Sequence, residues 1–122
     1  MASVWEGLCR QAAPRLEATL GAEHGPAARY WYAGGHEWDI VAESVAGGAL
    51  LLGEAKWSDK APSAPDVERT AQALMAKGLP AVGRAKREPR YAVFVSKRPK
   101  AKPKLPANVT LVDARDVLEA LS

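Results

Sequence analysis

Three charged residues in otherwise apolar segments have the types and spacing that metal-dependent chemistry needs. Asp39 lies in segment 37–43 (EWDIVAE), and Glu54 and Lys56 follow the apolar run of segment 49–57 (ALLLGEAKW). Charged side chains are costly to bury, so charges inside apolar strands require a reason. Two neighbouring carboxylates bind a hard divalent cation such as Mg²⁺, and a lysine beside them can orient a water and offset the charge of a phosphate.

The spacing of these residues predicts that a hairpin brings them together. Gly47 is the centre of a turn signal, with Asp39 eight residues before it and Glu54 seven after it. Directly opposed residues of an antiparallel pair have Cβ atoms about 5 Å apart. Glu54 and Lys56 are two residues apart and therefore point to one face of their strand. A solvated strand face with cross-strand ion pairs is the simpler interpretation, and the spacing leaves both open.

Alternating helix and strand signals predict the elements that position this trio. Pro14 interrupts the helical pattern of residues 3–20 and predicts a kink or a second short helix. Ser63 and Asp66 have capping-box spacing, and Asp113 is a candidate cap for the last helix. The predicted elements are helix 3–20, strands 28–33, 37–43 and 49–57, helix 66–77, strands 91–96 and 108–112, and a helix that ends at Leu121.

This order predicts one α/β domain over residues 1–122. The length suits a single hydrophobic core. Short connections between the first three strands indicate an antiparallel meander, from which the second helix crosses to the fourth strand. The expected architecture is therefore an α-β-β-β-α-β core with a further strand and helix at the C-terminal end.

Composition excludes several classes of protein. One cysteine in 122 residues cannot form an internal disulfide and excludes a zinc ribbon or finger. We expect Cys9 to be a small buried hydrophobe, and His24 and His36 to be surface loop residues. No apolar stretch approaches the roughly 20 residues that span a bilayer, and no signal peptide is visible. The sequence therefore predicts a cytoplasmic protein without a membrane partner.

Charge is distributed unevenly along the chain. Residues 1–61 hold five Lys/Arg against eight Asp/Glu, whereas residues 62–122 hold twelve against six. Repeated prolines in segment 97–106 predict an extended, mobile basic loop. A basic run of this kind binds phosphates in a salt-dependent way, although a solubilising loop has the same composition. The candidate DNA-binding residues are Lys97, Arg98, Lys100, Lys102 and Lys104.

The motifs of the chain resemble those of a known superfamily. The pattern Asp39…Glu54-Ala55-Lys56, on a hairpin between two helices, looks like that of the PD-(D/E)XK nucleases. The strings YWY at 30–32, EWDIVA at 37–42 and GEAKW at 53–57 are similar to the nuclease-like domain at the C-terminus of archaeal-type DEXX-box ATPases. The resemblance extends over essentially the whole chain.

This resemblance implies a fold, an activity and a set of site residues. It implies a restriction-endonuclease-like fold and metal-dependent endonuclease activity that hydrolyses DNA phosphodiester bonds. Asp39 and Glu54 would bind Mg²⁺ (or Mn²⁺), Glu6 of the first helix would complete the metal site, and Lys56 would be the catalytic lysine. The implied partners are DNA and an ATPase, and many nucleases of this fold act as homodimers.

Two features depart from the family pattern. Trp38 precedes Asp39 where the superfamily name places a proline. The chain also has no glycine-rich phosphate loop ending in Gly-Lys-Ser/Thr, which the ATPase would carry. The alternative hypothesis is a catalytically weak or inactive nuclease-fold module that binds DNA and acts with an ATPase partner.

Overall fold

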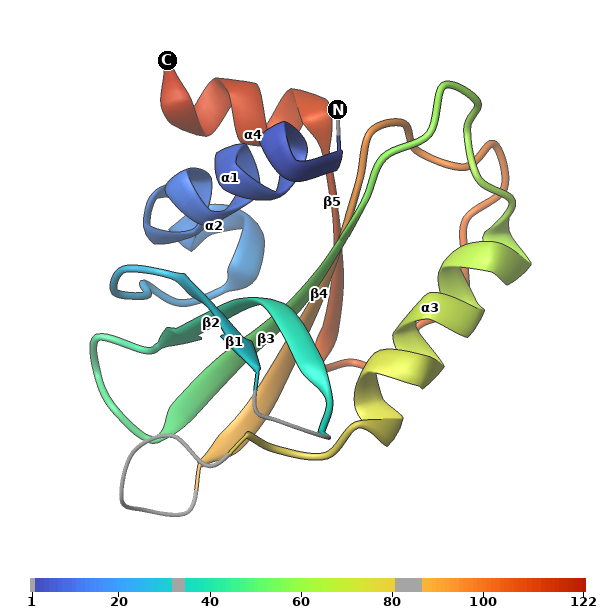
Figure 1. Ribbon diagram of the computed structural model, residues 1–122. Coiled ribbons are helices and arrows are strands. Elements are labelled where there is room, and N and C mark those ends of the chain that lie inside the picture. Colours follow the sequence, from blue (N-terminus) through green and yellow to red (C-terminus); the bar gives the residue numbers. More distant parts are fainter. Residues whose placement is uncertain (1, 32–34, 81–86) are drawn as a thin grey trace.

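A mixed five-stranded sheet with helices on both faces forms the domain (Figure 1). The computed structural model describes residues 2–31, 35–80 and 87–122. The strands lie in the order β1-β2-β3-β4-β5, antiparallel from β1 to β3 and parallel from β3 to β5. The predicted α/β class and its core are confirmed. The elements are α1 (Ala2–Ala12), α2 (Glu17–Leu20), β1 (Ala28–Trp31), β2 (Glu37–Glu43), β3 (Ala49–Lys56), α3 (Ala64–Ala76), β4 (Glu88–Val95), β5 (Val109–Asp113) and α4 (Ala114–Leu121).

The helix boundaries follow from local capping and from proline. A 3₁₀ turn over Ala13–Arg15 contains Pro14 and separates α1 from α2, which confirms the predicted interruption. Ser63 and Asp66 form the predicted capping box, in which each side chain accepts the backbone N–H of the other at 3.2 Å. α3 begins two residues earlier than predicted because Pro65 is tolerated in the first helical turn. A second capping box joins Asp113 to Asp116 at the start of α4.

The strands match the predicted ones apart from their ends. β4 begins at Glu88, three residues before the predicted start, because its parallel pairing with β3 extends back to Ala49. Pro89 lacks an N–H, but it is the second residue of the strand, where a missing donor costs little. Residues 32 and 33 of the predicted first strand lie outside the described residues.

Apolar side chains form one core on each face of the sheet. Ile40, Leu51 and Phe94 belong to the cluster with α1, α2 and α4, whereas Leu52, Val93 and Val95 belong to the cluster with α3. Figure 1 shows these helices on the two faces of the sheet. Cys9 of α1 is fully buried, as predicted, and burial raises the pKa of its thiol. Among the helices described, we find none with the length and apolar character needed to cross a membrane.

His24 corrects a prediction. We expected a surface residue, but its side chain is only 2 % exposed. The loop after α2 pairs with the end of β2: His24 forms an antiparallel bridge with Ser44, and the Gly25 N–H donates to the Glu43 carbonyl at 2.8 Å. Burial lowers the pKa of His24, which favours the neutral imidazole. Local sequence patterns do not predict the pairing of His24 with Ser44, because the two residues are about twenty positions apart in the chain. His36 is exposed, as predicted.

Gly53 allows close packing at the centre of the sheet. A Cβ atom at this position would lie 2.9 Å from Ile40 Cβ and 3.1 Å from Phe94 Cε1. Both contacts are too short, and both neighbours are fully buried. The absence of a side chain therefore lets β2, β3 and β4 pack together directly beside Asp39 and Glu54.

We predict that Gly53→Ala lowers the free energy of unfolding by about 1–3 kcal/mol, because the added methyl overpacks the core. Urea unfolding at equilibrium measures this change. Gly7→Ala is the matched control, since no atom lies within 4 Å of its added Cβ in α1. This control should leave the stability unchanged or raise it by up to roughly 1 kcal/mol. Equal destabilisation of the two variants would contradict the prediction.

Candidate functional site

A bulge in β2 aims Asp39 toward β3. Ala28 of β1 pairs with Val41 and Tyr30 pairs with Trp38, so that two β2 residues, Asp39 and Ile40, oppose one residue of β1. Trp38 and Val41 consequently face the same core, which the strict alternation of a strand would forbid. Bulges bend a strand and re-aim its side chains.

The hairpin register places Asp39 beside Glu54. The last described pair between β2 and β3 is Ile40 with Gly53. If the same register continued by one residue, Asp39 would lie opposite Glu54. The ladder is replaced there by a side-chain contact, because Oδ2 of Asp39 accepts the backbone N–H of Ala55 at 2.9 Å. The carboxylate therefore satisfies a β3 donor that β2 no longer reaches.

The environment of Asp39 opposes its charge. Burial is the main cause that raises the pKa of this carboxyl, and the hydrogen bond from Ala55 partly lowers it. The negative charges of Glu54 and Glu6 raise the pKa further, while Lys77 lowers it. The carboxylates of Glu6 and Glu54 are therefore both close enough to influence Asp39, and a cation nearby would favour the ionised form of Asp39.

Glu54 lies between two lysines. Its Oε1 is 3.5 Å from Lys56 Nζ, and its Oε2 is 3.2 Å from Lys77 Nζ. The side chains of Glu54 and Lys77 are 18 % and 19 % exposed, whereas that of Lys56 is 59 % exposed. Lys77 is therefore largely enclosed, whereas Lys56 pairs with Glu54 from a position that is open to solvent.

Sequence reasoning missed Lys77. This residue is the C-cap of α3, and its Nζ also donates to the Glu37 carbonyl of β2 at 2.6 Å. α3 runs across one face of the sheet. Val67 near its beginning lies close to Val95 at the end of β4, and Lys77 at its end reaches Glu37 at the start of β2. The only local signal was a lysine at a helix end, where a cation complements the helix dipole.

Glu6 faces a cation of its own helix. Arg10 Nη1 lies 3.9 Å from Glu6 Oε1 and donates to the Asp39 carbonyl at 2.9 Å. Arg10 therefore ties α1 to the bulge. Within residues 2–31, 35–80 and 87–122, no three His, Cys, Asp or Glu side chains form a metal-binding group. Metal binding by Asp39, Glu54 and Glu6 stays a prediction.

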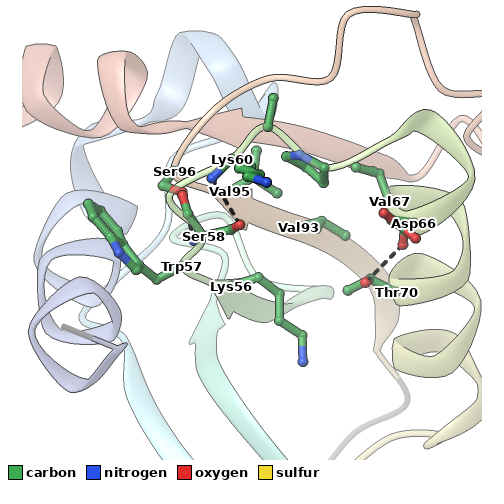
Figure 2. A pocket seen from close by; sticks show the side chains of 12 residues that line it. Lys56, Trp57, Ser58, Lys60, Asp66, Val67, Thr70, Val93, Val95 and Ser96 are labelled. Atoms are coloured by element: carbon green, nitrogen blue, oxygen red, sulfur yellow. Dashed lines mark hydrogen bonds between the residues drawn. The ribbon is translucent and has the colours of Figure 1, made fainter.

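Two adjoining cavities border this acid–lysine cluster. One, of about 310 Å³, lies between β3 and α3 and is lined by Glu54, Lys56 and Lys77. The other, of about 430 Å³, opens at the carboxyl ends of β3 and β4 (Figure 2). Lys56 lines both. The carboxyl ends of strands are where open α/β sheets commonly bind ligands.

The predicted DNA-binding residues fall into two groups. Lys97 Nζ donates to the Asp59 carbonyl at 2.6 Å, and Arg98 contacts Asp113 at 2.6 Å and Asp116 at 3.0 Å. The side chains of Lys97 and Arg98 therefore make contacts within the domain itself. Among the ion pairs of the described residues, none involves the remaining three, which are Lys100, Lys102 and Lys104. The mobility of this segment stays a prediction.

Comparison with known proteins identifies the family. A match to a family of archaeal and bacterial proteins of unknown function covers residues 1–70. The chain belongs to this family, DUF234. The DUF234 match includes Glu6, Asp39, Glu54 and Lys56, and it ends before Lys77. The searches of curated proteins and of solved structures found no match.

We predict that Asp39→Asn and Asp39→Ala differ in stability. Asparagine keeps an acceptor for the Ala55 N–H and removes the buried charge, so the free energy of unfolding at pH 7 should be unchanged or higher. Alanine leaves that N–H without its acceptor, which costs roughly 1–3 kcal/mol. Urea unfolding measures both variants, and equal losses would contradict this role of the carboxylate.

The pH dependence of the free energy of unfolding is a second test of Asp39. Because burial raises the pKa of Asp39 above its ordinary value of 3.8, the folded state binds this proton more tightly than the unfolded state. The contribution of Asp39 to stability is therefore greatest below pH 3.8 and is lost as the pH rises through the folded pKa. Asp39→Asn should remove this decline from a pH series of unfolding curves, and an unchanged decline would assign it to another group.

Proposed function

We propose that this DUF234 domain is a metal-dependent DNA endonuclease-like domain that hydrolyses phosphodiester bonds and acts with an ATPase. One observation carries the proposal: the β2 bulge sets the Asp39 carboxylate beside Glu54, with exposed Lys56 two residues further along β3 at the mouth of two cavities. Two acids and a lysine in this arrangement suit the hydrolysis of a phosphodiester. The resemblance of the motifs to ATPase-linked nuclease domains supports the ATPase partner.

The donor set suits a hard divalent cation. Burial raises the pKa of Asp39, and the negative charges of Glu54 and Glu6 raise it further, so a cation bound beside Asp39 would favour its ionised form. Asp39 and Glu54, with Glu6, would hold Mg²⁺ or Mn²⁺, which keeps several waters and needs few protein ligands. When bound, the ion acts as a Lewis acid and lowers the pKa of a coordinated water.

The surrounding residues have distinct tasks in this proposal. Lys56 would meet the phosphate, because its exposed ammonium offsets the negative charge that develops as the bond breaks. Lys77 would position Glu54 through its contacts with Oε2 and with the Glu37 carbonyl. The Ala55 N–H orients the Asp39 carboxylate.

We predict metal-dependent cleavage of plasmid or branched DNA in the presence of Mg²⁺ or Mn²⁺. Asp39→Ala and Lys56→Ala should each reduce the rate by at least about a hundredfold, as expected for groups that act on the reacting atoms. Arg115→Ala is a matched control, because Arg115 is an exposed cation of α4 that lines neither cavity. Cleavage that is absent, or equal in all variants, would refute the hydrolytic proposal.

A DNA-binding module without catalysis is the second candidate, and one observation favours it. Both oxygens of Glu54 face lysines, and one oxygen of Asp39 accepts a backbone N–H, so protein groups already occupy three of the four oxygens that would bind a metal. Such a module would bind DNA through the basic segment, and its binding would survive Asp39→Ala.

We predict that replacing Lys100, Lys102 and Lys104 by glutamine weakens DNA binding and reduces the salt dependence. The slope of log K against log salt should fall by about two to three, because each phosphate contact contributes about 0.9. Fluorescence anisotropy over a salt series measures this slope. Arg98→Gln is the contrasting variant, since it breaks the contacts with Asp113 and Asp116 and should lower stability instead. An unchanged slope in the triple variant would exclude this segment from the DNA interface.

A further inference from the structure

The larger cavity has an apolar floor at the end of the sheet. Val93 and Val95 of β4 and Val67 of α3 lie beneath the cavity and are almost fully buried (Figure 2), whereas Ala61 and Pro62 of the loop before α3 line its more exposed apolar side. The volume of about 430 Å³ lies in the range of small-ligand sites. The site is therefore large enough for a flat ring, and Ala61 and Pro62 offer such a ring an apolar contact.

Polar groups lie at the two ends of this floor. Figure 2 shows Ser58 and Ser96 at one end and Asp66 and Thr70 at the other. Ser96 Oγ donates to the Ser58 carbonyl at 2.7 Å and accepts the Ser58 N–H at 3.0 Å, which fixes that wall. Thr70 Oγ1 donates to the Asp66 carbonyl at 3.1 Å, so its oxygen still has acceptor capacity. An apolar floor between polar ends suits a heteroaromatic ring with hydrogen-bonding edges better than an aliphatic chain.

Cations lie around the mouth of the same cavity. Lys56 and Lys60 line it, and Lys97 is tied to the Asp59 carbonyl next to Lys60. Lys56 also lines the adjoining cavity with Glu54. A phosphate held at Lys56 would therefore have the acids on one side and the apolar floor on the other.

We propose that this cavity binds an unpaired nucleobase of a DNA strand, and that the proposed nuclease consequently acts on single-stranded or branched DNA. The inference rests on the proposed function for the phosphate at Lys56, and on the cavity for the base. A base within an intact duplex must first be unpaired and unstacked before it can enter a side pocket, whereas an unpaired base can turn out of the strand at little cost. The domain thus selects for unpaired DNA without reading its sequence.

Binding without metal tests this inference separately from cleavage. An oligonucleotide that carries 2-aminopurine is titrated with the full chain in EDTA, both single-stranded and in a matched duplex. The single strand should bind roughly tenfold more tightly or better, as expected for one added base contact, and the 2-aminopurine emission should change on binding. Equal affinities for the two forms would overturn the proposal.

Two variants assign the effect to the cavity. Ala61→Trp fills it from an exposed loop outside the adjoining cavity, and should abolish the preference for the single strand while leaving duplex affinity unchanged. Gln72→Phe, at an exposed position of α3 that lines neither cavity, should keep the preference. Circular dichroism checks folding, and Pro62→Trp fills the cavity from the same loop if Ala61→Trp does not fold. A preference that survives filling would overturn the assignment.

The outcomes separate the two proposals. If Mg²⁺-dependent cleavage fails while the cavity-dependent preference for single strands persists, the hydrolytic function is wrong and the base site is supported. If single-stranded and duplex DNA are bound and cut equally, the base site is wrong and hydrolysis is supported. If an aromatic side chain of a protein partner occupies the cavity instead, filling it will leave DNA binding unchanged, which also overturns the base site.

Discussion

The hydrogen bond from the Ala55 N–H to the Asp39 carboxylate is the interaction on which the candidate site depends. β2 leaves the β3 ladder after the pair Ile40–Gly53, because an extra residue turns the strand. A backbone donor next to the core would then lack a partner, which is costly. The Asp39 side chain supplies the acceptor. The bulge therefore requires a hydrogen-bond acceptor at this position, and with an aspartate it also brings a negative charge close to Glu54.

The balance of charge around this bond is built from three layers of the domain. α1 contributes Glu6 and Arg10, the hairpin contributes the acids and Lys56, and the end of α3 contributes Lys77. Helices on opposite faces of the sheet thus meet at one edge of the hairpin. Gly53 makes this possible because it lets the central strands pack closely directly behind Glu54. Packing and electrostatics are consequently coupled at this point of the fold.

The basic half of the chain is less uniform than its composition indicates. Arg98 belongs to the capping region of α4, where it contacts Asp113 and Asp116, and Lys97 closes the loop after β3. Among the described residues, the side chains of Lys100, Lys102 and Lys104 form no ion pair, although the Lys104 backbone N–H donates to Glu68 Oε2 at 2.9 Å. A count of charges therefore overstates the number available to an anionic partner. The cations that border the cavities come from other elements, chiefly Lys56, Lys60 and Lys77.

Much of the fold was encoded in short-range signals. The Pro14 break, the capping box at Ser63 and the spacing of Asp39 and Glu54 about Gly47 each depend on residues that are close in the chain or joined by one turn. These signals predicted the α/β order and the placement of the acid pair. They failed at the start of β4, where pairing with a distant strand overrides Pro89 and the charges around it.

Features that join distant segments required the tertiary structure. The burial of His24, the bulge at Asp39, and the arrival of Lys77 at Glu54 all depend on partners that lie many residues away. Helical periodicity specifies which face of α3 is apolar, but the angle at which α3 crosses the sheet comes from packing against β3 and β4. The residue types at Asp39, Glu54 and Lys56 therefore predicted the chemistry of the site. Packing between the layers of the domain determined that Lys77 lies beside Glu54, and it formed the cavities next to these residues.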